Sequence, residues 1–225
     1  MTLLVTLLVL ALPARAEWYS ERQSKMGTRV EVQLWHDDPA QASILLAKAM
    51  ARFDRIEEVM STYRSESEIS QVNRLAYERP VAVSDDLFYV IRRSLEFSLL
   101  TGGAFDITYE AVGQLYDYRE KVRPDADTID MQLESINYRL VKLNEDERSI
   151  AFEHDGVRIN LGGIAKGYAV DSVIDLLRQS GVEHAIAMAG GDTRLLGDRR
   201  GRPWLVGIRD PDRDGDWLTR LALTD

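Results

Sequence analysis

The sequence of 225 residues contains no cysteine. This absence excludes disulfide bonds, a thiolate metal site, a cysteine nucleophile and a lipid anchor on an N-terminal cysteine. Histidine is also scarce. We interpret His36, His154 and His184 as turn or surface residues, because no pair has the HExxH spacing of a zinc site. The sequence also lacks a GxSxG segment, so no local pattern suggests a serine triad.

Basic residues are fewer than acidic residues. The sequence has 28 lysines and arginines against 37 aspartates and glutamates, for a formal net charge of −9. This balance argues against nucleic acid as a partner, because binding a phosphate backbone needs clustered lysine and arginine. It leaves room for one small phosphorylated molecule held by a few local groups. With 45% hydrophobic and 29% charged residues, the chain has the composition of an ordinary globular protein.

Long apolar runs are absent after the first residues. A run over residues 3–12 precedes Ala14-Arg15-Ala16, a small-x-small cleavage pattern, so residues 1–16 are predicted to be a signal peptide. Residues 17–225 would then form one domain that is exported to the periplasm or the outer face of the inner membrane. It would be peripheral to the membrane at most. The alternative is a short N-terminal anchor or a buried segment, because the terminal amine is the only positive charge before the run.

Apolar periodicity predicts an α+β fold, with helices mainly in the first half and a mixed or antiparallel sheet in the second. Helices are expected at about 39–60, 65–73, 84–101, 107–116 and 163–181. Strands are expected at 28–35, 139–143, 149–152, 157–160, 185–189, 195–196, 204–208 and 217–223. The charged stretch 117–128 is predicted to be a loop.

Capping residues support three of the predicted helix starts. Asp38 followed by Pro39 provides an N-cap and a proline at the first helical position. Ser65 and Glu68 have the spacing of a capping box, and Ser84 precedes another apolar helical face.

The most informative segment is NLGGIAKGYAVD, residues 160–171. Two glycines end a predicted strand, and a helix begins with Lys166 in its first turn. Glycines let the backbone approach a phosphate, and the amides at a helix start carry partial positive charge. The pattern matches neither the Walker motif nor GxGxxG. The segment therefore predicts an anion-binding turn. The alternative is that the two glycines only form a structural turn between a strand and a helix.

Two further glycine pairs are ambiguous. In TGGAFDIT, residues 101–108, Phe105 and Asp106 offer a flat apolar face and an acceptor for an adenine or a ribose. An ordinary helix end with a buried phenylalanine explains the same residues. In AGGDT, residues 189–193, Asp192 is either a functional carboxylate or the cap of a turn.

The order of these segments is more specific than any one of them. Seven blocks follow one another: MGT (26–28), MSTY (60–63), SEISQVN (67–73), TGGAFDIT (101–108), NLGGIAKGYAVD (160–171), AGGD (189–192) and PWLVGI (203–208). This succession closely resembles the ApbE family of FAD:protein FMN transferases, from about residue 22 to the end of the chain.

The resemblance implies an enzyme that binds FAD with Mg²⁺. It would transfer FMN to a threonine hydroxyl of an exported or membrane-bound redox protein and release AMP. Some members of the family instead hydrolyse FAD to FMN and AMP. The metal would neutralise the diphosphate and steady the leaving group.

The resemblance also assigns site residues by position. Met26 and Tyr63 would flank the flavin, and Asn160 and Lys166 would lie along the FAD. The residues that would contact the nucleotide are Ala104, Phe105 and Asp106. The backbone carbonyl of Gly163 would be a magnesium ligand, since hard cations favour oxygen.

Two departures from the family pattern bear on function. Asn160 stands where the family usually has aspartate, which removes a negative charge beside the cofactor. The sequence also ends before the segments that would supply the catalytic histidine and two side-chain magnesium ligands. The catalytic residue is therefore unassigned, and the chain is expected to be a truncated, split or degenerate member. Besides the enzyme, an exported FAD-binding module without chemistry and a structural or interaction domain remain as alternatives.

Overall fold

The computed structural model describes residues 16–117, 120–213 and 215–225. The predicted signal peptide, apart from Ala16, lies outside these residues. Among the helices that the structure does describe, none has the length and apolar character needed to cross a membrane.

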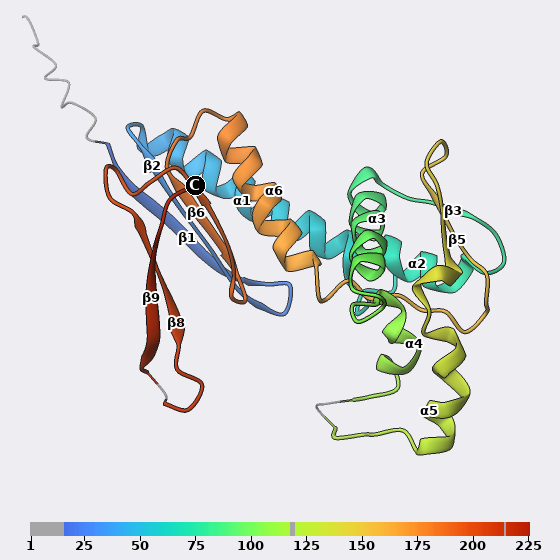
Figure 1. The fold of residues 1–225 in the computed structure, drawn as a ribbon. Coiled ribbons are helices and arrows are strands. Elements are labelled where there is room, and N and C mark those ends of the chain that lie inside the picture. The colour runs from blue at the N-terminus through green and yellow to red at the C-terminus, as the bar shows by residue number, and fades with distance from the viewer. Residues whose placement is uncertain (1–15, 118–119, 214) are drawn as a thin grey trace, which may run out of the picture.

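The main sheet has four strands in the order β1-β2-β6-β7, and every neighbouring pair is antiparallel (Figure 1). They are β1 (Glu17–Lys25), β2 (Thr28–His36), β6 (Ala185–Ala189) and β7 (Asp192–Leu196). The predicted strands at 28–35 and 185–189 are confirmed by β2 and β6, which pair with each other. Val30, Val32 and Leu34 are fully buried, as expected for one face of a strand. The first strand, β1, was not predicted.

Two helices pack side by side against this sheet, α1 (Pro39–Met60) and α6 (Ala165–Gln179) (Figure 1). The predicted bounds of α1 are confirmed at both ends. Asp38 accepts hydrogen bonds from the backbone amides of Ala40 and Gln41, at 2.8 and 3.2 Å. Phe53 of α1 and Leu177 of α6 are fully buried in the shared core. The sheet and α1 therefore form the packed frame against which α6 lies.

The remaining helices lie beyond one end of α6, around a small antiparallel sheet of order β3-β5-β4 (Figure 1). The helices are α2 (Glu68–Leu75), α3 (Asp85–Leu100), α4 (Glu110–Gly113) and α5 (Ala126–Gln132). The strands are β3 (Val81–Ala82), β4 (Val141–Asn144) and β5 (Ser149–Phe152), and short 3₁₀ turns cover 107–109, 133–135 and 138–140. Antiparallel sheets, with helices packed against one of them, confirm the α+β prediction.

Three local predictions need correction. The cap of α2 is Ser67, whose hydroxyl accepts from the Ser70 amide at 3.2 Å, and not Ser65. Asp125 caps α5 within the stretch that was predicted to be a loop. Residues 157–160 form no strand, because the side chain of Asn73 holds both backbone groups of Ile159, at 2.8 and 2.9 Å. That amide takes the place of a partner strand.

The last two strands, β8 (Trp204–Arg209) and β9 (Trp217–Leu223), form a separate antiparallel hairpin. Their predicted positions are confirmed. Trp204 is buried and packs edge-on against Trp18 of β1, with ring centroids 5.3 Å apart. Every residue of β9 is exposed, so this hairpin contributes little beyond Trp204 to the core.

Candidate functional site

The turn at Gly162 and Gly163 leads directly into α6, as the sequence predicted. The start of α6 differs from those of α1, α2 and α3, which are capped by the side chains of Asp38, Ser67 and Ser84. Its N-cap residue is Ile164, which makes no capping hydrogen bond with its side chain. The partial positive charge of this helix start is therefore not offset by a capping oxygen of its own, which suits an anion.

Lys166 adds a full positive charge to the same turn. Its Nζ donates to the carbonyl oxygen of Gly162 at 2.8 Å, so the ammonium group is held over the glycine turn. Helix dipole and lysine charge thus act at one place, which is the arrangement expected of a phosphate-binding turn.

The AGGD turn lies against this lysine. Gly190 has a φ of +60°, and a Cβ atom on it would come within 3.0 Å of Thr28 Oγ1 and 3.3 Å of Lys166 Cδ. Only glycine fits this approach without strain. Three motifs that are far apart in the sequence, at 26–28, 160–171 and 189–192, therefore meet at Gly190.

A cavity of about 530 Å³ opens beside this turn. Four predicted site residues line it: Met26, Tyr63, Asn160 and Lys166. The other lining residues are Gly27, Ile56, Glu57, Met60, Ser61, Thr62, Arg64, Gly162 and Ala165. Tyr63 is 96% exposed, so its ring is accessible for stacking on a ligand.

Met26 reaches the cavity from the tip of the β1–β2 hairpin. It has a φ of +53°, a conformation that L residues other than asparagine and aspartate rarely adopt. Its amide donates to Glu57 Oε2 at 2.8 Å, and the neighbouring Lys25 forms an ion pair with Asp54. The hairpin tip is therefore tied to α1, and this tie holds Met26 at the cavity.

Asn160 has all its side-chain polar atoms engaged. Its Oδ1 accepts from the Gly162 amide at 2.7 Å, and its Nδ2 donates to Glu110 Oε2 at 3.0 Å and Thr62 Oγ1 at 3.4 Å. Burial raises the pKa of the Glu110 carboxyl, and the Asn160 hydrogen bond partly offsets this. Asn160 thus braces the glycine turn against α4 and the segment that follows α1.

The predicted nucleotide-contacting residues lie elsewhere. Ala104, Phe105 and Asp106 are not among the residues that line the 530 Å³ cavity. Phe105 packs against Phe97, with ring centroids 6.3 Å apart, and lies close to Gly163.

Both carboxylate oxygens of Asp106 have structural partners. Oδ1 accepts from the amide and hydroxyl of Thr108 at 2.8 and 2.6 Å, and Oδ2 accepts from the Tyr138 amide at 2.9 Å. Asp106 therefore caps the 3₁₀ turn that follows it and fixes the segment 136–140.

A second, more open hollow of about 1120 Å³ lies between α1, α3 and α6. Gly163 and Asp192 both line it. Within the described ranges, no three histidine, aspartate or glutamate side chains are grouped to hold a metal ion. Magnesium needs about six oxygens, so the Gly163 carbonyl with the described side chains does not make up a fitting ligand set.

Sequence reasoning missed two acidic residues that shape the site. Glu57 lies three residues before Met60 on α1, so the two side chains share one face of the helix. This spacing could have identified Glu57 as a neighbour of the MSTY motif. Glu110 carried no such signal, because only the tertiary structure brings it to Asn160.

Comparison with known proteins agrees with this arrangement of motifs. The sequence pattern of the ApbE family matches residues 26–225. The chain belongs to the ApbE family. An FAD:protein FMN transferase from Klebsiella pneumoniae is 30% identical over 202 residues, which are 89% of this chain and 61% of that protein. A Vibrio cholerae protein of the same name is 32% identical over 72% of this chain and 49% of its own length.

Solved ApbE structures share the fold. The ApbE protein of Thermotoga maritima superposes with a TM-score of 0.84 at 27% identity, over 92% of this chain and 68% of that one. The flavin transferase ApbE of Vibrio cholerae gives 0.79 at 27% identity, over 88% and 65%. The chain thus spans about half to two thirds of the length of these relatives.

Proposed function

We propose that this chain binds FAD in the 530 Å³ cavity and takes part in transferring FMN from FAD to a protein. The observation that carries the proposal is the convergence of Lys166, the glycine turn and the uncapped start of α6 at one wall of that cavity. The FAD diphosphate is the group whose charge this wall matches.

Two other residues of the cavity lining suit the flavin. Met26 and Tyr63 offer a flexible apolar side chain and an exposed aromatic ring, which pack well against a flat ring system. The volume lies within the range of small-molecule sites, which is about 300–1,000 Å³. The adenine half would extend toward Ala104, Phe105 and Asp106, along the turn at Gly163.

The proposed reaction is a phosphoryl-group substitution. An acceptor threonine hydroxyl forms a bond to the phosphorus of the FMN half, the bond from that phosphorus to the bridging oxygen breaks, and AMP leaves. The hydroxyl proton passes to a base. Lys166 and the start of α6 would hold the diphosphate and reduce its negative charge, so the bridging oxygen leaves more readily.

Magnesium dependence is part of the proposal through the resemblance alone. When bound, the ion would neutralise the diphosphate, and the Gly163 carbonyl is the ligand that the family pattern assigns. Because the described side chains do not complete the ligand set, we derive no step through the metal.

The test uses the purified chain with FAD, Mg²⁺ and an acceptor protein that carries the target threonine. We expect AMP release and a yellow acceptor that keeps its flavin after denaturation, with a threonine-to-valine acceptor as the control. FAD binding without AMP release would leave the binding module as the function of these 225 residues. AMP release with either acceptor, or without one, would indicate hydrolysis. Absence of FAD binding would overturn the proposal.

We also propose that the chain is exported and acts on an acceptor of a membrane redox complex. The apolar run at 3–12 and the cleavage pattern at 14–16 support this. N-terminal sequencing of protein recovered from cells tests it. A mature chain that begins at Glu17 in the periplasmic fraction is expected. A full-length chain in the cytoplasmic fraction would contradict export, and a full-length chain in the membrane fraction would favour the anchor.

A further inference from the structure

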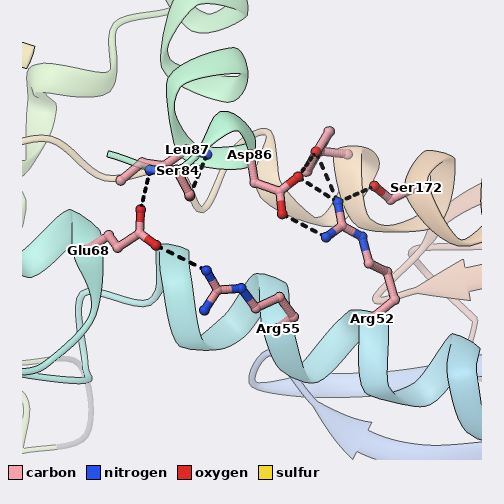
Figure 2. Close-up of polar contacts among 8 residues, drawn as sticks. Arg52, Arg55, Glu68, Ser84, Asp86, Leu87 and Ser172 are labelled. Atoms are coloured by element: carbon pink, nitrogen blue, oxygen red, sulfur yellow. Dashed lines mark hydrogen bonds and ion pairs between the residues drawn. The ribbon is translucent and has the colours of Figure 1, made fainter. Parts of the chain in front are cut away.

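A polar network joins α1, α3 and α6 (Figure 2). The guanidinium group of Arg52 on α1 makes two parallel hydrogen bonds of 2.7 Å to the Asp86 carboxylate, in the first turn of α3. The same group donates to Ser172 Oγ at 2.8 Å and to Tyr168 Oη at 3.1 Å, both on α6. Tyr168 in turn donates to Asp86. One arginine therefore links three helices.

This network is partly shielded from water. The side chains of Arg52 and Asp86 are 22% and 21% exposed. Two-point pairing of a guanidinium with a carboxylate fixes orientation as well as distance, which a lysine cannot do. The Arg52 hydrogen bonds hold the pKa of Asp86 below its usual value, and burial raises the pKa of Tyr168. Arg52 and Asp86 are thus charged partners with a defined geometry.

The network lies on the far side of α6 from the proposed cofactor cavity. Tyr168 and Ser172 line the larger hollow, whereas Lys166 lines the 530 Å³ cavity. Residues two positions apart on a helix point about 200° apart, so Tyr168 and Lys166 face opposite ways. Arg52 and Asp86 therefore cannot act on a ligand in that cavity directly. They act through α6.

We propose that Arg52 and Asp86 are positioning residues that set the place of the α6 start, and with it the Gly163–Lys166 turn, for cofactor binding. The inference rests on the proposed function, which assigns the diphosphate to that turn. Tyr168 is the link, since it is two residues from Lys166 and binds both partners. Because the start of α6 has no side-chain cap of its own at Ile164, its position depends more on such outside contacts.

The chain offers a matched control beside the network. Arg55, one turn further along α1, pairs with Glu68 of α2 at 3.2 Å, and Glu68 accepts from the Ser84 amide at 2.8 Å (Figure 2). This second pair also joins an arginine of α1 to a carboxylate, but it makes no hydrogen bond or ion pair with α6 among the described residues. Its loss should affect stability without moving the glycine turn.

The experiment compares Arg52→Met, Asp86→Asn and Tyr168→Phe with Arg55→Met in the full chain. Two quantities are measured: amide hydrogen exchange without ligand at Ile164, Ala165 and Tyr168, whose amides are hydrogen-bonded at the start of α6, and FAD affinity by titration. We expect the three network variants to exchange several-fold faster at these amides and to bind FAD about tenfold more weakly. Arg55→Met should match the parent in both. Tyr168→Phe removes one hydroxyl and keeps the ring. This variant therefore tests the role of the network even if Arg52→Met does not fold.

The outcomes separate the inference from the function on which it rests. If the parent binds FAD and the network variants behave like Arg55→Met, the positioning role is overturned and the binding site stands. If the parent binds no FAD, the proposed function fails, and hydrogen exchange alone decides whether the network orders the α6 start. Arg52→Lys, which keeps the charge but loses the two-point geometry, should recover only part of the loss. Full recovery would contradict a geometric role.

Discussion

Asn160 donates its side-chain amide to the carboxylate of Glu110, across 3.0 Å. This bond connects the segment before the glycine turn with α4, and it explains why an amide suits position 160 in this chain. A carboxylate at 160 would face Glu110 directly. Beside the glycine turn, this chain thus combines an amide with a neighbouring acid.

Replacing Asn160 with aspartate should therefore destabilise the protein. In Asn160→Asp, two carboxylates share one partly buried place, and each raises the pKa of the other. We expect a lower melting temperature at neutral pH and recovery of most of the loss as the pH falls toward the ordinary glutamate pKa of 4.5. The double variant Asn160→Asp/Glu110→Gln should recover stability at neutral pH. Equal melting temperatures for the parent and Asn160→Asp would show that the two side chains are not coupled.

Gly190 should tolerate no side chain. In Gly190→Ala the new Cβ meets Thr28 and Lys166, and the positive φ adds strain, so we expect a loss of about 1–3 kcal/mol in the free energy of unfolding. FAD affinity should fall as well, because Lys166 must shift. Chemical denaturation and flavin titration measure the two effects.

Gly167 is the control for this substitution. It lies in the first turn of α6, and an added Cβ would meet nothing within 4 Å. Gly167→Ala should therefore stabilise the protein by about 0.5–1 kcal/mol, since alanine loses less backbone entropy in a helix. If both variants changed stability in the same direction, the close approach at Gly190 would not be the cause.

Acid should weaken the three-helix network through Asp86. Its pKa is lowered in the folded protein, chiefly by the Arg52 hydrogen bonds, from an ordinary value of 3.8. The carboxylate therefore contributes stability that is fully present above that ordinary value and is lost as the pH falls through the lower, folded-state pKa. Asp86→Asn should be less stable than the parent at neutral pH and should lose less stability in this acid range. Parallel stability curves against pH would contradict the assignment.

Local signals predicted much of the fold. The bounds of α1 follow from the Asp38–Pro39 start and an uninterrupted apolar face, both of which are properties of neighbouring residues. The strand β1 was missed because its residues are mostly polar and none is fully buried, as suits an edge strand. The predicted strand at 157–160 was wrong because a strand needs a partner, and the partner of Ile159 is the Asn73 side chain.

The candidate site also contains both residues that local sequence predicted and contacts that it did not. The glycine turn and Lys166 were predictable, because two glycines and a helix start with a lysine in its first turn are adjacent in the sequence. The supporting contacts were not. Glu110 at Asn160 and Arg52 at Tyr168 connect residues far apart in the sequence, and only the packing of whole helices brings them together. Predicted residues line the cavity, and contacts that were not predicted support the turn beside it.

The most direct test of the account is the FAD affinity of Lys166→Ala relative to the parent chain, measured by titration at low ionic strength. If the start of α6 holds the diphosphate, the loss of this charge should weaken binding at least about tenfold, because a charge-assisted contact to phosphate is lost. The difference should shrink as salt is added. Equal affinities for the two proteins would show that the diphosphate does not lie at this turn.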